Sequence, residues 1–283
     1  MEKLIKKNLS KKFKMKKYYY VHTDFFNFLS FNLKKNVSFE KTQKNINKYL
    51  NKMLTTLNEI TAGNLIIPTY NYDFGKKKIF DLYNDKSHVG AFSEFFRKKF
   101  VKNRTKTPFF SSCSAKKIPY HDFELDFIDP FGKNSEFNFL KENNGKILNF
   151  GSNFAPTYII FIERFIPGGP LYRYEKIFNG KIIEKKKERK ISLVYIVRPK
   201  GIDISYNLNK IKEDLSKEGI LKLKKTKNNF KYEECDAKDF FYYSLEKIKK
   251  NPLYFLSDKT INFLSKNNIL KNGKVKIESF EKN

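Results

Sequence analysis

The chain has 283 residues, of which 40% are hydrophobic and 17% aromatic, and this excludes an intrinsically disordered protein. Its formal net charge of +28 raises the question of a polyanionic partner. Only six of the 58 basic residues are Arg, however, and the Lys residues are spread along the whole chain. Because Arg makes the bidentate contacts that read bases and phosphates, we interpret the charge as a solvated, lysine-rich surface. Specific nucleic-acid binding is not expected, and a polyanion-binding patch remains the weaker alternative.

Cysteine usage and hydropathy exclude two further classes of protein. Cys113 and Cys235 lie far apart and belong to no CxxC or Cys/His cluster, so neither a disulfide framework nor a metal site is expected. The basic first 17 residues contain no apolar core of a signal peptide. The most apolar stretch, Tyr158–Ile166, is too short to span a bilayer. We therefore expect a cytoplasmic protein without membrane insertion.

Strand-like and helix-like segments alternate in the first half of the chain. Strands are predicted at Tyr18–His22, Asn64–Thr69 and Lys146–Phe150, and helices at about 46–60, 89–99 and 157–165. Ser87 is expected to cap the second helix, and Pro156 suits the first turn of the third. This alternation predicts an α/β fold with a predominantly parallel sheet.

The second half contains weaker signals. We predict a strand at 191–197, a helix around 208–215, and a helix over Ala237–Lys250 that Asp236 caps. The lysine-rich segment 181–190 is predicted to be a charged loop or a hairpin. We interpret residues 1–17 as a basic extension and 18–283 as one domain, with a C-terminal elaboration from about residue 190.

Ligands of α/β proteins bind at the carboxyl ends of the strands, which directs attention to His22 and Asp24. His22 follows an apolar strand directly and is the strongest of the three histidines for a functional role, although a lone His is more often structural. Asp24, at the same turn, forms either a simple Asx turn or part of a site. Both alternatives stay open.

Two carboxylates are candidates for chemistry. Glu94 lies three residues before Arg97 on a helix, where an ion pair is the simpler explanation. Glu163 lies within the otherwise apolar stretch TYIIFIERFI. A carboxylate in such a position is either paired with Arg164 or another cation, or kept for chemistry.

Seven segments together resemble a known family. They are VHTD (21–24), GNLIIPTY (63–70), IFD (79–81), SHVGAFSEFFRKKF (87–100), NRTKTPFFS (103–111), NGKILNFG (144–151) and TYIIFIE (157–163). Their succession resembles the aminoglycoside 3-N-acetyltransferase family, whose members typically show VHSS or VHSD, GTLxMPTY, FD, SxVGxxxExFR, RSxHPxxS-like, GxILxxG and THxxE-type motifs in this order. The resemblance runs over about residues 18–180 and continues weakly through 196–199. VHTD followed by two Phe residues resembles the branch that acts in surface-polysaccharide sugar synthesis.

The resemblance implies a three-layer α/β/α sandwich with a mostly parallel central sheet. It also implies acyl transfer from a coenzyme A thioester, with acetyl-CoA as donor and no metal. The acceptor would be the amino group of an amino sugar, a sugar nucleotide or an aminoglycoside-like molecule.

Site residues follow from the resemblance by position. Glu163 would be the helix carboxylate and Glu94 the acid of the VGxxxExFR helix. The hydroxyls expected around the pantetheine arm belong to Thr23, Ser87 and Ser111, with Arg104 at the coenzyme's phosphates. Coenzyme A is expected between the turn after Val21, the helix start Ser87–Gly90, which includes Val89, and the loop Arg104–Ser111. Tyr70, Asp81 and Ile160 are expected at the acceptor.

The chain departs from the family pattern where a base is needed. Ile160 stands at the place of the family's histidine, and Thr107 stands where the resistance enzymes have a His before Pro108. Since Ile cannot accept a proton, either another group such as His22 or Asp24 is the base, or the reaction is lost or changed. The alternative function is therefore a catalytically impaired relative that binds coenzyme A or sugar ligands without turnover.

Overall fold

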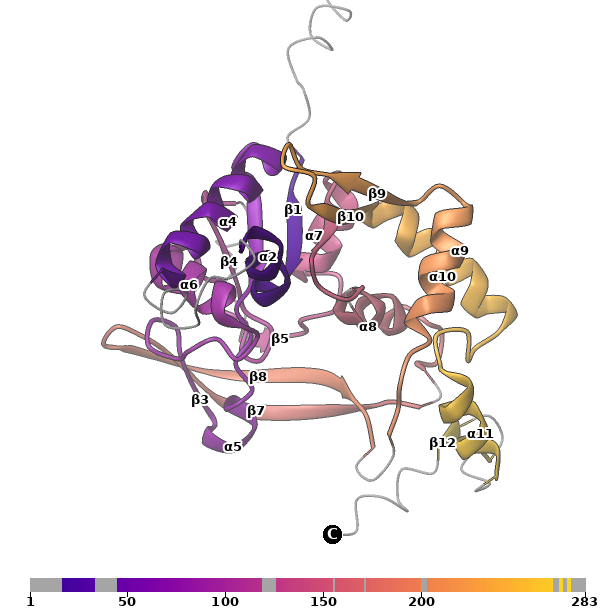
Figure 1. The fold of residues 1–283 in the computed structure, drawn as a ribbon. Coiled ribbons are helices and arrows are strands. Elements are labelled where there is room, and N and C mark those ends of the chain that lie inside the picture. Colours follow the sequence, from indigo (N-terminus) through magenta and orange to yellow (C-terminus); the bar gives the residue numbers. More distant parts are fainter. Residues whose placement is uncertain are drawn as a thin grey trace, which may run out of the picture.

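The central element of the structure, a computed structural model, is a six-stranded sheet (Figure 1). The structure describes residues 17–33, 45–118, 126–154, 156–170, 172–199, 203–266, 270–271 and 274–275. The sheet has the order β4 (Ser112–Ser114), β2 (Leu65–Pro68), β1 (Tyr19–Thr23), β6 (Lys146–Phe150), β10 (Lys231–Asp236) and β9 (Leu221–Lys225).

The sheet is mixed rather than mostly parallel. β1 runs parallel to β2 and β6, but β4, β10 and β9 each pair in antiparallel fashion. A short connection between β9 and β10 permits only an antiparallel pair, because parallel neighbours need a long crossover. The expected parallel arrangement is therefore correct only around β1.

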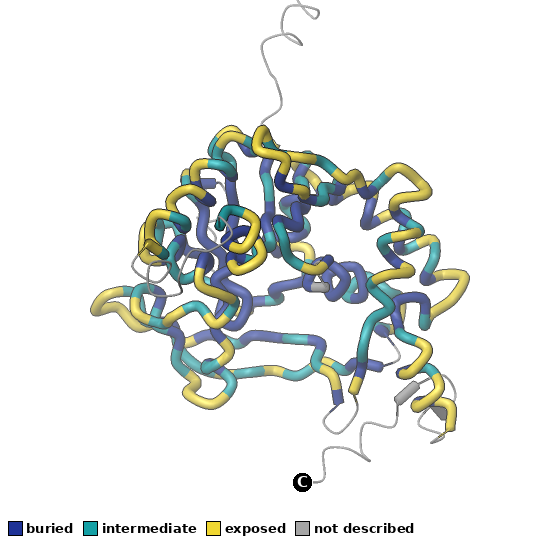
Figure 2. The backbone as a smooth tube through the Cα atoms, in the orientation of Figure 1, coloured by how far each residue is buried: buried dark blue, intermediate teal, exposed yellow. Residues whose placement is uncertain are grey.

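Both faces of the sheet are buried. Tyr20 and Ile147 belong to one hydrophobic cluster, whereas their sequence neighbours Val21 and Leu148 belong to the other. This follows from the alternation of side chains along a strand. Helices cover each face (Figures 1 and 2). On one side are α2 (Phe25–Asn32), α4 (Ile46–Thr61) and α6 (Ala91–Phe100), and on the other α7 (Glu136–Glu142), α8 (Pro156–Arg164), α9 (Leu208–Lys217) and α10 (Ala237–Lys250).

A second, four-stranded sheet lies beneath α8 in Figure 1. Its order is β3 (Ile79–Asp81), β7 (Tyr174–Glu184), β8 (Lys187–Val197) and β5 (Phe127–Ile128). β7 and β8 pair along their whole length, so the lysine-rich segment 181–190 is a hairpin. Ile182 and Leu193 of this hairpin share a hydrophobic cluster with Phe161 of α8.

The remaining elements are short. They are α5 (Phe74–Lys77), a 3₁₀ turn η1 (Val101–Asn103), α11 (Asp258–Lys266), β11 (Leu270–Lys271) and β12 (Lys274–Val275). Among the helices of the described ranges, none combines the length and apolar character that crossing a membrane requires.

Helix α6 begins later than the sequence predicts. Gly90 is its N-cap residue, with φ 106°, and no side chain caps this end. Since helical geometry starts only at Ala91, Ser87 is not the cap, and that prediction is wrong. The predicted strand at 146–150 and the helix at 237–250, by contrast, coincide with β6 and α10, and Asp236 accepts the expected bond from Lys238 N.

Gly151 fixes the geometry at the ends of β1 and β6. Its φ is +75°, and a Cβ there would lie 3.1 Å from the ring of Phe230 and 3.2 Å from the carbonyl oxygen of Asp24. Only glycine therefore fits without strain. The Gly151 carbonyl accepts a 2.8 Å hydrogen bond from the Asn27 side chain, which ties α2 to the loop after β6.

Candidate functional site

The carboxyl ends of β1 and β6 form a switch point in the sheet. The chain leaves β1 into α2 on one face and leaves β6 into α8 on the opposite face. Such a divergence opens a crevice in which α/β proteins bind ligands. The two strands pair side by side, with His22 in register with Asn149.

Three buried polar atoms near this edge have no hydrogen-bond partner in the described structure. They are Nε2 of His22, Oδ1 of Asn149 and Oγ of Ser152. A buried polar atom without a partner costs free energy and is uncommon in native proteins, so these three atoms point to a ligand or water site. Thr23 lies half-buried at the same strand end.

His22 is neutral near pH 7. Its Nε2 atom is buried, and this burial lowers the pKa of the imidazole to about 4. Its ring lies 5.3 Å from that of Tyr20. A neutral imidazole has a free lone pair that can accept a proton, and the lowered pKa makes His22 a weaker base than an exposed histidine.

Asp24 acts as a helix cap. Its Oδ1 accepts a 3.0 Å hydrogen bond from Asn27 N, and Asp24 is the N-cap residue of α2. Of the two alternatives left open by the sequence, the local turn interaction is therefore the one that the structure displays.

A pocket of about 400 Å³, which we name the Ile160 pocket, lies between α8 and the β7–β8 hairpin. Five residues of its wall are aromatic: Tyr72, Phe109, Phe110, Phe178 and Tyr195. The other five are Gly75, Thr157, Ile160, Val197 and Arg198. An apolar, aromatic wall with few polar groups is typical of a small-molecule site. Ile160, the residue that the resemblance places at a histidine position, is thus a pocket residue.

Phe109, on the wall of this pocket, has an unusual backbone conformation. Its φ is 65°, in the left-handed region, which is rare for a bulky side chain. The backbone of Asn71 donates a 3.2 Å hydrogen bond to its carbonyl oxygen, and its ring packs 5.0 Å from Phe178. Strain of this kind concentrates at functional sites, which supports the choice of pocket.

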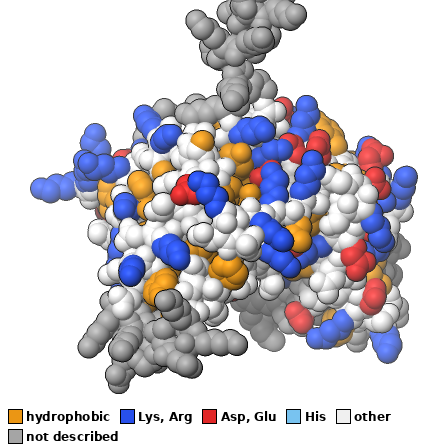
Figure 3. Space-filling view, turned by 45° about the horizontal axis from the view of Figure 1, so that its top comes forward, with side chains coloured by type: hydrophobic (Ala, Val, Ile, Leu, Met, Phe, Trp, Pro, Cys, Tyr) orange, Lys and Arg blue, Asp and Glu red, His pale blue; other side chains and the backbone are white. Residues whose placement is uncertain are grey.

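Two larger hollows lie elsewhere. They measure about 810 and 780 Å³ and follow the edge strands and the turn of the β7–β8 hairpin. The wall of the smaller one consists mostly of charged hairpin residues, whereas the wall of the larger one also contains Ile79, Asn179 and Ser192. Lys181 and Glu188 of the hairpin form an ion pair with each other. Figure 3 likewise shows a face on which Lys and Arg side chains are scattered among acidic and apolar ones.

A chain of hydroxyl groups leads from the central sheet to the Ile160 pocket. The hydroxyl oxygens of Tyr20 and Tyr70 lie 2.7 Å apart. Tyr70 also forms a side-chain hydrogen bond with Thr157, which is on the pocket wall. Tyr70, expected at the acceptor, is only 4% exposed. In this structure it meets the pocket through Thr157.

Glu163 is part of the core. Its side chain is fully buried and forms a 2.7 Å ion pair with Arg173. The hydroxyls of Tyr172 and Tyr206 donate to its two carboxylate oxygens at 2.6 and 2.9 Å. Ile160 is on the wall of the Ile160 pocket, whereas Glu163, one helical turn later, is not.

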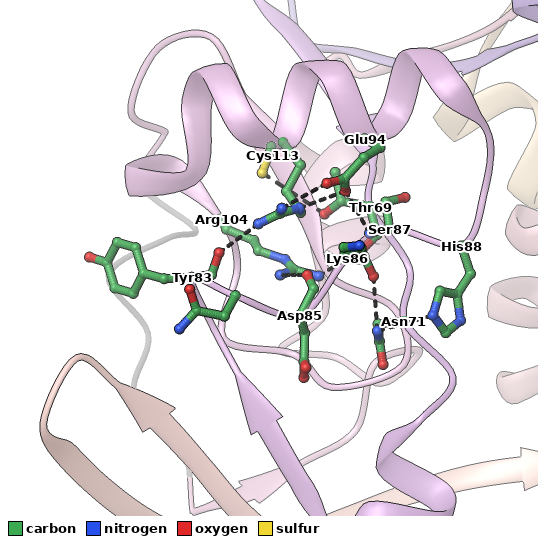
Figure 4. Close-up of polar contacts among 12 residues, drawn as sticks. Thr69, Asn71, Tyr83, Asp85, Lys86, Ser87, His88, Glu94, Arg104 and Cys113 are labelled. Atoms are coloured by element: carbon green, nitrogen blue, oxygen red, sulfur yellow. Dashed lines mark hydrogen bonds and ion pairs between the residues drawn. The ribbon is translucent and has the colours of Figure 1, made fainter.

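Arg104 and Ser111 both form hydrogen bonds within the protein, and Figure 4 shows Arg104 beside Thr69 and Asp85. The guanidinium of Arg104 donates to the carbonyl oxygens of Thr69, Leu82 and Asp85 and to Ser111 Oγ, at 2.7–3.1 Å. Arg104 is 3% exposed and Ser111 is fully buried. Four of five guanidinium N–H groups are thus engaged, and the expected role at the coenzyme's phosphates does not fit.

Glu94 and Asp81 hold the loop before α6. Glu94 pairs with Arg97 and accepts a 2.8 Å bond from Ser87 N, and Arg97 donates to the Tyr83 carbonyl (Figure 4). Asp81 accepts from the backbone N–H groups of Tyr83 and Asn84. The ion-pair interpretation of Glu94 is therefore the correct one, and Asp81 stabilises a turn rather than lining the Ile160 pocket.

The crevice expected for coenzyme A is only partly assembled. Arg104 of the loop 104–111 contacts Leu82 and Asp85, which precede the expected Ser87–Gly90 segment. The turn after Val21 instead contacts the end of β6, where Asp24 N donates to the Phe150 carbonyl at 3.0 Å. Ser87 Oγ accepts a long bond, 3.4 Å, from Val89 N.

Two further groups, His88 and Glu136, were not singled out by the sequence analysis. His88 is exposed, and its ring lies 6.1 Å from that of Tyr72 on the pocket wall (Figure 4). Glu136 is buried at the first position of α7, where Ser112 Oγ donates to it at 2.6 Å. Burial raises the pKa of Glu136 to about 8, so it carries a proton near neutral pH. The SHVG motif is a sequence signal that could have identified His88. No comparable motif surrounds Glu136. His121 lies outside the described residues.

No metal centre is found in the described ranges: they contain no group of three or more His, Cys, Asp or Glu side chains placed to hold an ion.

Comparison with solved structures identifies the fold. The structure matches aminoglycoside acetyltransferase AAC(3)-IVa (TM-score 0.58, 15% identity, 90% of each chain covered). It matches AAC-IIIb bound to CoASH (TM-score 0.60, 12% identity, 88% of this chain and 96% of that one). It also matches the YokD protein from Bacillus subtilis (TM-score 0.58, 11% identity, 88% and 99%). No protein-family model and no curated protein sequence matches the chain. The chain therefore has the fold of the aminoglycoside 3-N-acetyltransferases, as the resemblance implies.

Proposed function

We propose that this protein is an acyl-CoA-dependent N-acyltransferase, with acetyl-CoA as the donor and the amino group of an amino sugar as the acceptor. The observation that carries the proposal is the shared fold, which extends over about nine tenths of this chain and of acetyltransferases that include a coenzyme A complex. Related structures were solved with a gentamicin and with apramycin, which are amino-sugar compounds. An acetyl-CoA donor fits the cytoplasmic location expected from the sequence, and the VHTD motif favours a role in surface-polysaccharide sugar synthesis.

The crevice at the ends of β1 and β6 is the proposed donor site. The free atoms of His22, Asn149 and Ser152 supply one acceptor lone pair, one carbonyl oxygen and one hydroxyl there. Helix α8 begins directly after this edge, and the N–H groups of its first turn favour carbonyl and phosphate oxygens. Thr23 adds a hydroxyl group at the strand end.

The Ile160 pocket is the proposed acceptor site. Aromatic walls bind the faces of a sugar ring, and the Thr157 hydroxyl is placed to hydrogen-bond a polar group within the pocket. Acyl transfer requires that the amine lose a proton as it attacks the thioester carbonyl. His22 is the proposed base because it is neutral and lies beside Tyr20, at the start of the hydroxyl chain that ends at Thr157. His88 is the other candidate, since its ring lies 6.1 Å from that of Tyr72 on the pocket wall.

A second function, ligand binding without turnover, is favoured by two observations. Ile160 replaces the histidine of the family pattern, and Glu163 is engaged by Arg173 rather than free to orient a base. A protein of this kind would bind coenzyme A or sugars and transfer nothing.

Thiol release distinguishes the two functions. The full chain is incubated with acetyl-CoA and an amino sugar, and free thiol is measured against a reaction without the sugar. Release that depends on the sugar supports the transferase. Calorimetric binding of coenzyme A without release supports the second function, and no binding at millimolar coenzyme A contradicts both.

A further inference from the structure

The described wall of the Ile160 pocket carries a positive charge and no negative one. Among the described residues of its wall, Arg198 is the sole charged side chain, and none is Asp or Glu. Arg198 is exposed, and its guanidinium carbon lies 4.9 Å from the ring centre of Tyr206. An aromatic pocket with a cation on its wall is suited to a ligand that combines an apolar surface with a negative charge.

Arg198 differs from the other arginines of the chain. Arg97, Arg164, Arg173 and Arg189 each pair with a carboxylate, and Arg104 donates to four protein oxygens. Within the described part of the chain, Arg198 packs on Tyr206 and no carboxylate pairs with it. Among these residues its guanidinium N–H groups have no acceptor and can bind a ligand.

The surface beneath Arg198 is rigidly held. The Tyr206 hydroxyl accepts a 2.7 Å hydrogen bond from Arg173 and donates a 2.9 Å bond to Glu163. The buried Glu163–Arg173 pair thereby fixes the ring on which Arg198 stacks. Such stacking orients a guanidinium before a ligand arrives, which reduces the entropy lost on binding.

We propose that Arg198 binds an anionic group, a phosphate or carboxylate, of the acceptor, so that the acceptor is an anionic amino sugar such as a sugar phosphate. This inference rests on the proposed function, because it names the substrate class of the same pocket. A polycationic aminoglycoside would meet Arg198 and, in the described wall, no carboxylate to pair with its ammonium groups. The phosphates of coenzyme A have the same chemistry, so the test separates donor from acceptor.

The test is calorimetric titration of the full chain at low salt with glucosamine 6-phosphate, glucosamine, gentamicin and, in a separate experiment, coenzyme A. We expect the phosphorylated sugar to bind about tenfold more tightly than glucosamine, as a charge-assisted hydrogen bond allows. Arg198→Gln should abolish this difference and leave the affinity for coenzyme A within about twofold. Arg189 lies on β8, which ends one residue before Arg198, and Arg189 is not on the wall of the pocket. Arg189→Gln is the matched control and should preserve the difference.

Each other outcome overturns the inference. Equal binding or no binding of the two sugars, or tighter binding of gentamicin, contradicts an anionic acceptor. If Arg198→Gln still binds glucosamine 6-phosphate more tightly than glucosamine, the preference comes from the general positive charge of the protein and not from Arg198. Loss of coenzyme A affinity in Arg198→Gln would assign Arg198 to the donor. Because the sugar titrations contain no coenzyme A, they can succeed even where the transferase proposal fails, and unchanged thermal unfolding of both variants excludes misfolding.

Discussion

Glu163 and Arg173 form an ion pair of 2.7 Å in which neither side chain is more than 1% exposed. The pair joins α8 to the start of β7 and fixes Tyr206 as well. Its geometry is that of a core interaction, although the family pattern assigns a catalytic carboxylate to this position.

The first prediction concerns the stability of this pair. Glu163→Gln leaves the charge of Arg173 buried without an ionic partner, and we expect the free energy of unfolding to fall by roughly 3–5 kcal/mol. Urea denaturation measures it. Glu175→Gln is the control, because Glu175 pairs with Arg164 at a half-exposed site, where such pairs contribute less than about 1 kcal/mol. A Glu163→Gln protein with unchanged stability and lost activity would instead make Glu163 a catalytic group.

A second prediction concerns position 160. Ile160→His places an imidazole on the pocket wall, but Glu163, bound to Arg173, is not available to orient the ring. We expect no gain in thiol release from acetyl-CoA. Ile160→Leu, which conserves volume, is the control for packing. A clear gain in Ile160→His would mean that the Glu163–Arg173 pair opens and that the family's base and carboxylate can be rebuilt.

Glu136 predicts a pH dependence of stability. Burial raises the pKa of Glu136 to about 8 in the folded protein. The contribution of this titration to the free energy of unfolding is therefore complete below about pH 4.5 and is lost as the pH rises through 8. Glu136→Gln lacks this titration. The stability of the variant relative to the unmodified protein should therefore rise between about pH 5 and 8, by up to about 1.4 kcal/mol per pH unit. Urea midpoints of both proteins at several pH values measure this change. A stability difference between the two proteins that stays constant with pH would show that Glu136 is ionised at pH 7.

His22 gives the opposite slope. Burial lowers its pKa to about 4, so the unfolded chain binds a proton below about pH 6.5 while the folded protein does not. The His22 contribution to stability is complete above pH 6.5 and is lost as the pH falls towards 4. His22→Asn should flatten this part of the profile, and His88→Gln, at an exposed histidine, should leave it unchanged. If the stability of His22→Asn depends on pH in the same way as that of the unmodified protein, the His22 ring is not buried and neutral.

Elements with strong local signals could be predicted from the sequence. β6 ends at Gly151, and α10 lies between the capping Asp236 and the Asn251-Pro252 stop, so their bounds were correct. Only the end of β7 was anticipated, as part of the loop or hairpin at 181–190, because its residues are mostly half-buried or exposed and alternate little in hydropathy. Its stability comes from pairing with β8 and β3, which no local pattern reports.

The site was less predictable, because its contacts join distant segments. Arg104 is held by carbonyl oxygens from Thr69, Leu82 and Asp85, and the spacing in the sequence reveals none of these contacts. For Glu163, the alternative of another cation is correct. Its partner is Arg173, whereas Arg164 pairs with Asp129 and Glu175.

The most direct test of the transferase proposal is the stoichiometry of transfer. The full chain is mixed with acetyl-CoA and an anionic amino sugar, and the released thiol and the acetylated amine are both quantified by mass spectrometry. The account predicts one acetylated amine for each thiol and negligible thiol release without the sugar. Saturable coenzyme A binding with no sugar-dependent thiol release would contradict it and identify a ligand-binding relative of the acetyltransferases.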